Sequence, residues 1–206
     1  MDKKKQKKRL VPTKIKRLFD ICGLFFGAGG AVAAVLVICI VNLFTPECSV
    51  FFSHERRGRR GKPFTIYKFQ TMKNNTPNCA TGELENPEQY ITKFGKFLRK
   101  TSLDELPQLW NILKGDMSFV GPRPLISSEM RAHRLRLEYG VYRFRPGLTG
   151  WAQINGRDSI SLLRKMKLDK EYCDNWSLKL DLIILLRSVG AVVKQEGFHE
   201  GTYHRR

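Results

Sequence analysis

The longest uncharged stretch of the chain constrains its fold more than any other feature. It runs from Ile21 to Val41 without an Asp, Glu, Lys or Arg. As a helix rising about 1.5 Å per residue it would be about 30 Å long, which matches the hydrocarbon core of a bilayer. Asp20 interrupts its start, and residues 42–46 offer no small-residue cleavage site, which is unlike a cleaved signal peptide. The sequence therefore predicts a membrane segment.

Basic residues flank this segment on both sides, within residues 3–17 and again within residues 56–62. Because Lys- and Arg-rich flanks of membrane helices stay in the cytoplasm, a simple span would leave one flank on the wrong side. A re-entrant helix, which enters and leaves by the same face, satisfies both flanks. The cluster at residues 27–30, Gly-Ala-Gly-Gly, provides a place to bend, although small residues also suit close packing between helices. An ordinary span remains the alternative.

Charge and length narrow the class of protein. The 206 residues include 37 Lys and Arg against 19 Asp and Glu, a formal net charge of +18, so the expected partners are anionic: lipid headgroups, nucleotides or nucleic acid. This length allows one compact core plus a membrane element. We expect a basic N-terminal anchor at residues 1–17, a membrane helix at 18–46 and a catalytic domain at 47–206. The five cysteines and four histidines are scattered, which favours neither a disulfide framework nor a His-based metal site.

The remaining sequence predicts a mixed fold of the α/β (α+β) class. Residues 49–52 and 64–69 are typical of strands, and the turn at 56–61 would join them as a hairpin. Residues 73–90 lack periodicity and are expected to form a surface loop. Helical patterns cover residues 89–99, 104–113, 125–139, 160–175 and 177–194, and the last has an apolar side suited either to the core or to a membrane interface.

Two adjacent acids, Asp104 and Glu105, are the first candidates for catalysis. Pro107 is tolerated only in the first turn of a helix, so both acids are expected at a helix N-terminus. A structural interpretation competes with the catalytic one. Ser102 and Glu105 have the spacing of a capping box, and acids in a first turn interact favourably with the helix dipole.

An arginine enclosed by prolines is the second candidate. Arg123 lies between Pro122 and Pro124, which stiffen the backbone that presents it. The planar guanidinium suits fork-like binding of phosphate oxygens, although a surface turn is the alternative. Further basic residues occur beside compact segments marked by Gly or Pro, namely Lys68, Arg99 and Arg145. Residues 143–157 add several glycines and polar side chains in one loop-strand-loop unit.

Five segments in this order resemble the bacterial sugar transferase family, the monotopic phosphoglycosyl transferases that act on polyprenol phosphate. They are residues 16–20 (KRLFD), 67–72 (YKFQTM), 102–108 (SLDELPQ), 115–124 (GDMSFVGPRP) and 145–150 (RPGLTG). The resemblance extends from about Lys16 to Gly197 and implies the minimal catalytic form of the family. It implies a re-entrant membrane helix hairpin, followed by a small, mostly helical catalytic domain with a short β-hairpin and interfacial amphipathic helices.

The resemblance also implies a reaction. Asp104 would attack the β-phosphate of a UDP-sugar, release UMP and pass the sugar phosphate to polyprenol phosphate, the first lipid-linked step of glycan biosynthesis. Mg²⁺ would bridge carboxylate and phosphate oxygens, and a helix N-terminus would lower the pKa of Asp104. The expected metal ligands are Asp104, Glu105 and Asp169, although Asp169 is equally compatible with a simple helix-surface charge. The expected substrate-binding residues are Lys68, Arg99, Arg123 and Arg145.

Location and partners follow from the same resemblance. The catalytic domain would face the cytoplasm at the inner membrane and contact anionic lipid, without binding nucleic acid, and a homo-oligomer is compatible with this arrangement. One departure concerns the membrane helix, because Val32 and Ala33 stand where the family commonly has Ser-Pro. Two alternatives remain: a non-catalytic basic membrane-associated binding protein, and an inactive structural partner in glycan assembly.

Overall fold

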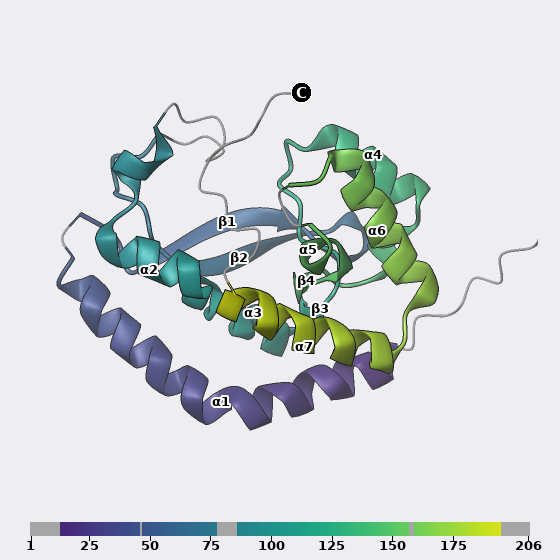
Figure 1. Ribbon diagram of the computed structural model, residues 1–206, viewed down its shortest axis with the longest axis horizontal. Coiled ribbons are helices and arrows are strands. Elements are labelled where there is room, and N and C mark those ends of the chain that lie inside the picture. The colour runs from purple at the N-terminus through teal and green to yellow at the C-terminus, as the bar shows by residue number, and fades with distance from the viewer. Residues whose placement is uncertain (1–12, 46, 78–85, 157–158, 195–206) are drawn as a thin grey trace, which may run out of the picture.

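The computed structural model describes residues 13–45, 47–77, 86–156 and 159–194. Helix α1 (Thr13–Leu43) lies along one side of a small globular body of helices and short strands (Figure 1). Mixed helix and sheet agree with the predicted fold class. Most of the predicted basic anchor and part of the predicted loop at 73–90 lie outside the described residues.

The predicted β-hairpin is present, but its first strand is longer than the predicted 49–52 and includes two residues of the predicted turn at 56–61. Strands β1 (Phe51–Arg57) and β2 (Pro63–Phe69) pair antiparallel in a register that runs from Phe51 opposite Phe69 to Arg57 opposite Pro63. The 3₁₀ turn η1 (Arg59–Gly61) joins them. A second, parallel pair is formed by β3 (Ser118–Val120) and β4 (Gly147–Thr149). Strand β4 falls in the loop-strand-loop unit expected at residues 143–157.

The expected helices are present, with different ends. They are α2 (Lys93–Thr101), α3 (Gln108–Lys114), α4 (Met130–Glu138), α6 (Leu162–Asn175) and α7 (Leu178–Lys194), joined by the shorter η3 (Pro87–Tyr90), η4 (Leu103–Glu105), η5 (Val141–Arg143) and α5 (Trp151–Ile154). Helix α2 starts later than predicted because the Thr92 side chain caps it by accepting from the Gly95 N–H. Helix α4 also starts late, because Leu125 pairs with Arg57 in an isolated β-bridge.

The core consists of adjoining clusters of buried side chains. One gathers Val120, Phe144, Tyr172 and Ile184 between the β3–β4 pair and helices α6 and α7. A second packs Phe69 of β2 against Leu98 of α2 and, from the membrane helix, Ile38. Helix α1 is therefore part of the same core as the globular body.

The N-terminal end of α1 is held by a buried ion pair. Lys16 Nζ lies 2.5 Å from Asp181 Oδ2 of α7, and Asp181 is fully buried. Tyr172 and Trp176 also donate to that carboxylate, at 2.7 and 3.1 Å, and their rings lie about 6 Å from the ammonium. Buried charges persist only when paired and hydrogen-bonded, which this arrangement achieves.

Two neighbouring residues of α1 attach it to other elements. The fully buried Asp20 accepts from Ser118 Oγ at 2.8 Å and from the Phe119 N–H at 3.1 Å, both in β3. Arg17 donates to the carbonyl oxygens of Ile112 and Leu113, at the end of α3. Residues 16–20 therefore attach α1 to three parts of the globular body, namely α7, β3 and the end of α3.

The opposite end of α1 returns to the same body, whereas residues 25–30 in its middle are exposed. Ile38 is 4% exposed in the second core cluster, and Asn42 Nδ2 donates to the Val50 carbonyl at 3.4 Å. Phe25 and Phe26 are 78% and 94% exposed. The helix bends along its course, with α7 beside its first half and α2 near its end (Figure 1). Both ends of α1 are therefore anchored on one side.

Within the described residues, α1 is the one helix long and apolar enough to cross a membrane, on length and composition alone. The glycines at 27, 29 and 30 have no neighbouring atoms within 4 Å of where a Cβ would lie. The described chain therefore provides no close-packed helix contact at that cluster. The exposed apolar surface in the middle of α1 is suited to contact with lipid.

Replacing Lys16 by Met should destabilise the protein, because the Asp181 carboxylate would stay buried without its cation. We expect a loss of about 3 kcal/mol in the free energy of unfolding, or about 10 °C in Tm. Thermal unfolding in detergent micelles, followed by circular dichroism, measures this change. Lys179→Met, at an exposed position on α7, is the matched control. Equal Tm values for the two variants would contradict the anchoring role of the pair.

Candidate functional site

The two candidate acids lie in a tight turn between α2 and α3. Ser102 ends α2 in the left-handed region, with φ at 57°, and η4 follows with Asp104 and Glu105. Helix α3 begins later, after Pro107. The capping-box interpretation is wrong, since the Ser102 side chain makes no capping bond. A non-glycine residue in this conformation is strained, and such strain is often found at functional sites.

Lys68 of β2 joins the two carboxylates. Its Nζ lies 2.6 Å from Glu105 Oε1 and 3.9 Å from Asp104 Oδ2. The side chains of Lys68 and Asp104 are 22% and 13% exposed, so this charge cluster is largely shielded from water. The structure therefore brings together Lys68, Asp104 and Glu105, three of the residues expected at the site.

The pKa of Asp104 is raised from 3.8 to about 6. Burial is the largest cause, and the neighbouring Glu105 charge adds to it, while Lys68 and Arg99 oppose the rise. The prediction of a lowered pKa is therefore wrong. It assumed a dipole from a helix that starts at Asp104, whereas α3 begins four residues later and desolvation dominates.

Packing around the turn fixes these side chains. The buried Asn111 of α3 donates to the Thr65 carbonyl at 2.7 Å and accepts from the Tyr67 N–H at 3.2 Å, which ties α3 to the strand that carries Lys68. Gly95 lets α2 approach Thr71, because a Cβ there would lie 2.2 Å from the Thr71 carbonyl oxygen. That approach lets Arg99 Nε donate to Thr71 Oγ1 at 2.8 Å. Contacts made by both α2 and α3 therefore hold the turn in place.

The proline-flanked Arg123 is exposed, and its charge acts on Arg56 of β1. Burial lowers the pKa of Arg56, Arg123 lowers it further, and Glu129 and Glu105 raise it. Arg56 Nε is buried without a hydrogen-bond partner in the described part of the chain. Sequence reasoning treated Arg56 only as a basic flank. The strand pairing gives no signal for it, because the register sets Arg56 opposite Phe64 and Lys68 opposite Phe52.

Two predicted site residues lie elsewhere. Asp169 of α6 pairs with Arg136 of α4 at 2.7 Å, with both side chains almost fully buried. Burial raises the pKa of Asp169, and Arg136 opposes the rise. Arg145 donates through Nε to the Gly115 carbonyl at 2.7 Å, and its pKa is lowered by burial and by the charges of Arg59 and Arg17. Its charged neighbours differ from those of Asp104.

The donor set fits a divalent cation in part. Asp104 and Glu105 present two carboxylates from one turn, and Mg²⁺ commonly takes one or two carboxylates plus phosphate and water oxygens. In the described ranges, no three Asp, Glu, His or Cys side chains gather as a metal cluster. A ligand role for Asp169 stays a prediction, which its pairing with Arg136 does not favour.

Comparison with known proteins assigns a family to this arrangement. A family model described as bacterial sugar transferase matches residues 11–195. The chain is 44% identical over 187 residues to a Bacillus subtilis protein named uncharacterized sugar transferase EpsL, covering 90% of this chain and 91% of that protein. It is 36% identical over 198 residues to the UDP-galactose-lipid carrier transferase of Erwinia amylovora, covering 89% of this chain and 41% of that protein.

The match to a third relative likewise covers less than half of that protein. The chain is 36% identical over 200 residues to the undecaprenyl-phosphate galactose phosphotransferase of Salmonella typhimurium, covering 89% of this chain and 41% of that protein. This chain therefore spans less than half of the Erwinia and Salmonella relatives, and nearly all of the Bacillus protein.

Asp104→Asn should stabilise the protein near neutral pH. Because the pKa of Asp104 is higher in the folded protein, about 6, than its ordinary value of 3.8, ionisation disfavours folding. The gain should be full above about pH 6, reach at most about 3 kcal/mol, and vanish below about pH 4. Tm values of the variant and the original protein across this range measure it.

The control for this measurement is Glu171→Gln, which removes an exposed carboxylate. Its Tm difference from the original protein should stay small at every pH. A Tm difference for Asp104→Asn that does not depend on pH would contradict the electrostatic explanation.

Proposed function

The chain belongs to the bacterial sugar transferase family, and from this premise we propose that it transfers a sugar 1-phosphate from a UDP-sugar to a polyprenol phosphate. The observation that carries the proposal is the largely buried Asp104 carboxylate, compensated by Lys68, on a domain whose core includes a membrane helix. The names of the Erwinia and Salmonella relatives support a nucleotide-sugar donor and a polyprenyl acceptor.

The first step is attack by an Asp104 oxygen on the β-phosphorus of the donor. A bond forms between that oxygen and phosphorus, the bond from phosphorus to the bridging oxygen breaks, and UMP leaves with that oxygen. The sugar phosphate is then esterified to Asp104. An ionised carboxylate needs no base, and with a pKa of about 6 Asp104 is mostly ionised at about pH 7.

The second step regenerates the free carboxylate of Asp104. A phosphate oxygen of the polyprenol phosphate attacks the same phosphorus, and the bond to Asp104 breaks. The product is a polyprenyl diphosphate sugar. Splitting the transfer into two displacements allows the soluble donor product to leave before the lipid acceptor reacts.

Cationic side chains would hold the donor diphosphate. Lys68 lies beside both acids, and Arg99 influences the pKa of Asp104. The charges of Glu105 and Arg123 both act on Arg56. Arginine binds phosphate oxygens through paired donors, and the buried Arg56 Nε lacks a partner among the described residues. A Mg²⁺ ion held by Asp104 and Glu105 would, when bound, neutralise phosphate charge.

The membrane arrangement brings the acceptor to this site. We propose that α1 is re-entrant and that the catalytic domain lies on the cytoplasmic face. Support comes from the two ends of α1, which attach to one globular body through Lys16 and Ile38, and from the exposed middle between them. Exposed apolar residues on the helices suit a membrane interface, namely Phe97, Trp110, Leu113, Leu182 and Leu186.

The purified full chain should release UMP from a UDP-sugar in the presence of Mg²⁺ and polyprenol phosphate. Asp104→Asn should abolish release, by at least about a thousandfold, because the amide is not a nucleophile. Mass spectrometry of the protein after incubation with donor alone should find one sugar phosphate added at Asp104. Glu171→Gln is the control. Release of UDP, or full activity of Asp104→Asn, would refute the proposal.

Cysteine labelling tests the re-entrant helix. In a cysteine-free background, single cysteines at Lys14 and Glu47, which are exposed beside the two ends of α1, should react with an impermeant reagent from the same side of sealed vesicles. Labelling from opposite sides would establish a span and contradict the re-entrant arrangement. Ser177, exposed at the start of α7, marks the side of the globular body.

A further inference from the structure

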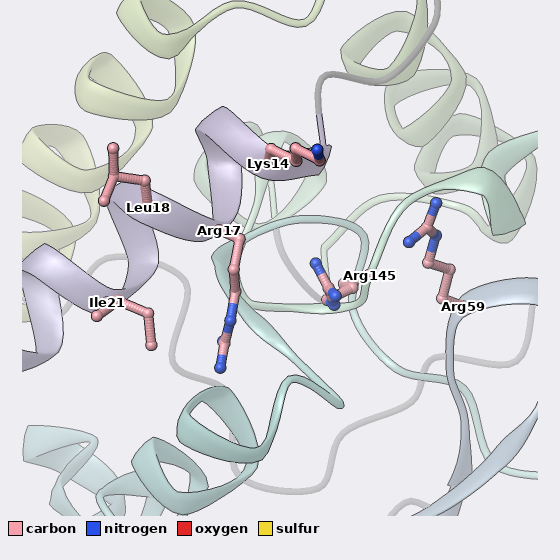
Figure 2. Close-up of a pocket in the computed structure, with 6 residues that line it drawn as sticks. All are labelled: Lys14, Arg17, Leu18, Ile21, Arg59 and Arg145. Atoms are coloured by element: carbon pink, nitrogen blue, oxygen red, sulfur yellow. The ribbon is translucent and has the colours of Figure 1, made fainter.

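A pocket lies at the base of helix α1, and its lining does not include Lys68, Asp104 or Glu105. It has a volume of about 470 Å³ and is lined by Lys14, Arg17, Leu18, Ile21, Arg59 and Arg145. Four of these residues come from the first turns of α1, one from the hairpin turn η1, and one from the loop before β4 (Figure 2). Three elements distant in sequence therefore build it.

The lining carries four positive charges and no negative one. In the part of the chain that the structure describes, no ion pair involves Lys14, Arg17, Arg59 or Arg145. The arginines instead donate to neutral carbonyls: Arg17 to Ile112 and Leu113, Arg145 to Gly115, and Arg59 to Arg143. These bonds orient the guanidinium groups without neutralising them.

The charges also act on one another. The pKa of Arg145 is lowered by burial, then by Arg59 and Arg17, while Asp20 and Asp116 oppose that effect. Asp20 is already bonded to Ser118 and Phe119, and Asp116 lies 3.2 Å from Lys114 Nζ. A bound anion would reduce the mutual repulsion of the cluster.

The apolar part of the lining indicates what kind of anion fits. Leu18 is 65% exposed, and Ile21 begins the uncharged part of α1, which continues to the exposed Phe25. Basic groups at the headgroup level with aliphatic groups on the hydrocarbon side match an amphiphile with a phosphate head and acyl chains. A free phosphate would use only the basic half.

The pocket is separated from the transfer site by α3. Arg17 and Arg145 contact the last residues of α3 and Gly115, whereas Asp104 precedes its first turn. Seven helical residues correspond to about 10 Å. An acceptor phosphate must reach Asp104 to react, so a phosphate in this pocket would be held away from the reaction.

We propose that this pocket binds the headgroup of an anionic phospholipid, whose acyl chains lie along Leu18 and Ile21 of α1. The bound lipid joins the membrane helix, the hairpin turn and the loop before β4, and so completes the attachment begun by the 16–20 segment. This assignment concerns binding alone and does not depend on the proposed transfer reaction.

Native mass spectrometry of the purified full chain tests the assignment, with phosphatidylglycerol and phosphatidylcholine of equal chain length. The original protein should retain phosphatidylglycerol in preference to phosphatidylcholine. Arg59→Gln should weaken phosphatidylglycerol binding by about fivefold, the effect of removing one basic group near an anionic lipid. Arg60→Gln removes the same charge from the same turn at an exposed position outside the pocket lining, and should bind as the original does.

Alternative ligands and folding defects have their own controls. If Arg59→Gln unfolds early, Lys14→Gln, at an exposed lining position, should give the same fivefold loss. Equal binding of both lipids, or equal affinity of Arg59→Gln and Arg60→Gln, would overturn the proposal. Displacement of phosphatidylglycerol by an equal concentration of inorganic phosphate would overturn the proposal, because it would show that the pocket binds anions in general. Stronger binding of polyprenol phosphate at the same residues would assign it to the acceptor.

Discussion

The attachment of α1 by the Lys16–Asp181 pair is the interaction on which the rest of the structure depends. It places a full charge pair in the core, where removal of either partner would leave an uncompensated ion. Asp181 also accepts from Tyr172 and Trp176, so the same carboxylate orders α6, its following turn and α7. An apolar helix that would otherwise partition freely into lipid thereby acquires a fixed orientation relative to Asp104.

That orientation determines how the proposed donor and the proposed lipid acceptor could reach Asp104. If α1 is embedded as proposed, its exposed middle would face lipid on one side of the globular body, whereas Lys68, Asp104 and Glu105 lie in a turn between helices α2 and α3. Phe97 of α2 and Trp110 of α3 are both about half exposed on either side of that turn. A water-soluble donor and a membrane-bound acceptor can therefore meet at one carboxylate, provided that these helices rest at the interface.

Sequence reasoning succeeded where local patterns determine the structure and failed where long-range packing does. Strand-favouring residues and a glycine-containing turn indicated the β1–β2 hairpin, and helical patterns indicated α6 and α7. The grouping of Lys68 with Asp104 and Glu105 followed from the resemblance. The partners of Asp169 and Arg145 could not be inferred, because they depend on how α4 and the loop before β4 pack. The pKa of Asp104 was misjudged because burial is a property of the assembled core.

The raised pKa of Asp104 suits a nucleophile, because the pKa of a carboxylate nucleophile must lie within a narrow range. Desolvation raises the pKa of a carboxylate. A carboxylate with a higher pKa is more basic and donates electrons more readily to phosphorus, so a largely buried position favours attack. Too high a pKa would leave it protonated at neutral pH and unreactive. Lys68 limits the rise, and its closer contact with Glu105, 2.6 Å against 3.9 Å, leaves Asp104 less tightly paired. With a pKa of about 6, roughly nine tenths of the molecules carry an ionised Asp104 at about pH 7. The turn thus gives up folding stability to keep one carboxylate both charged and poorly solvated.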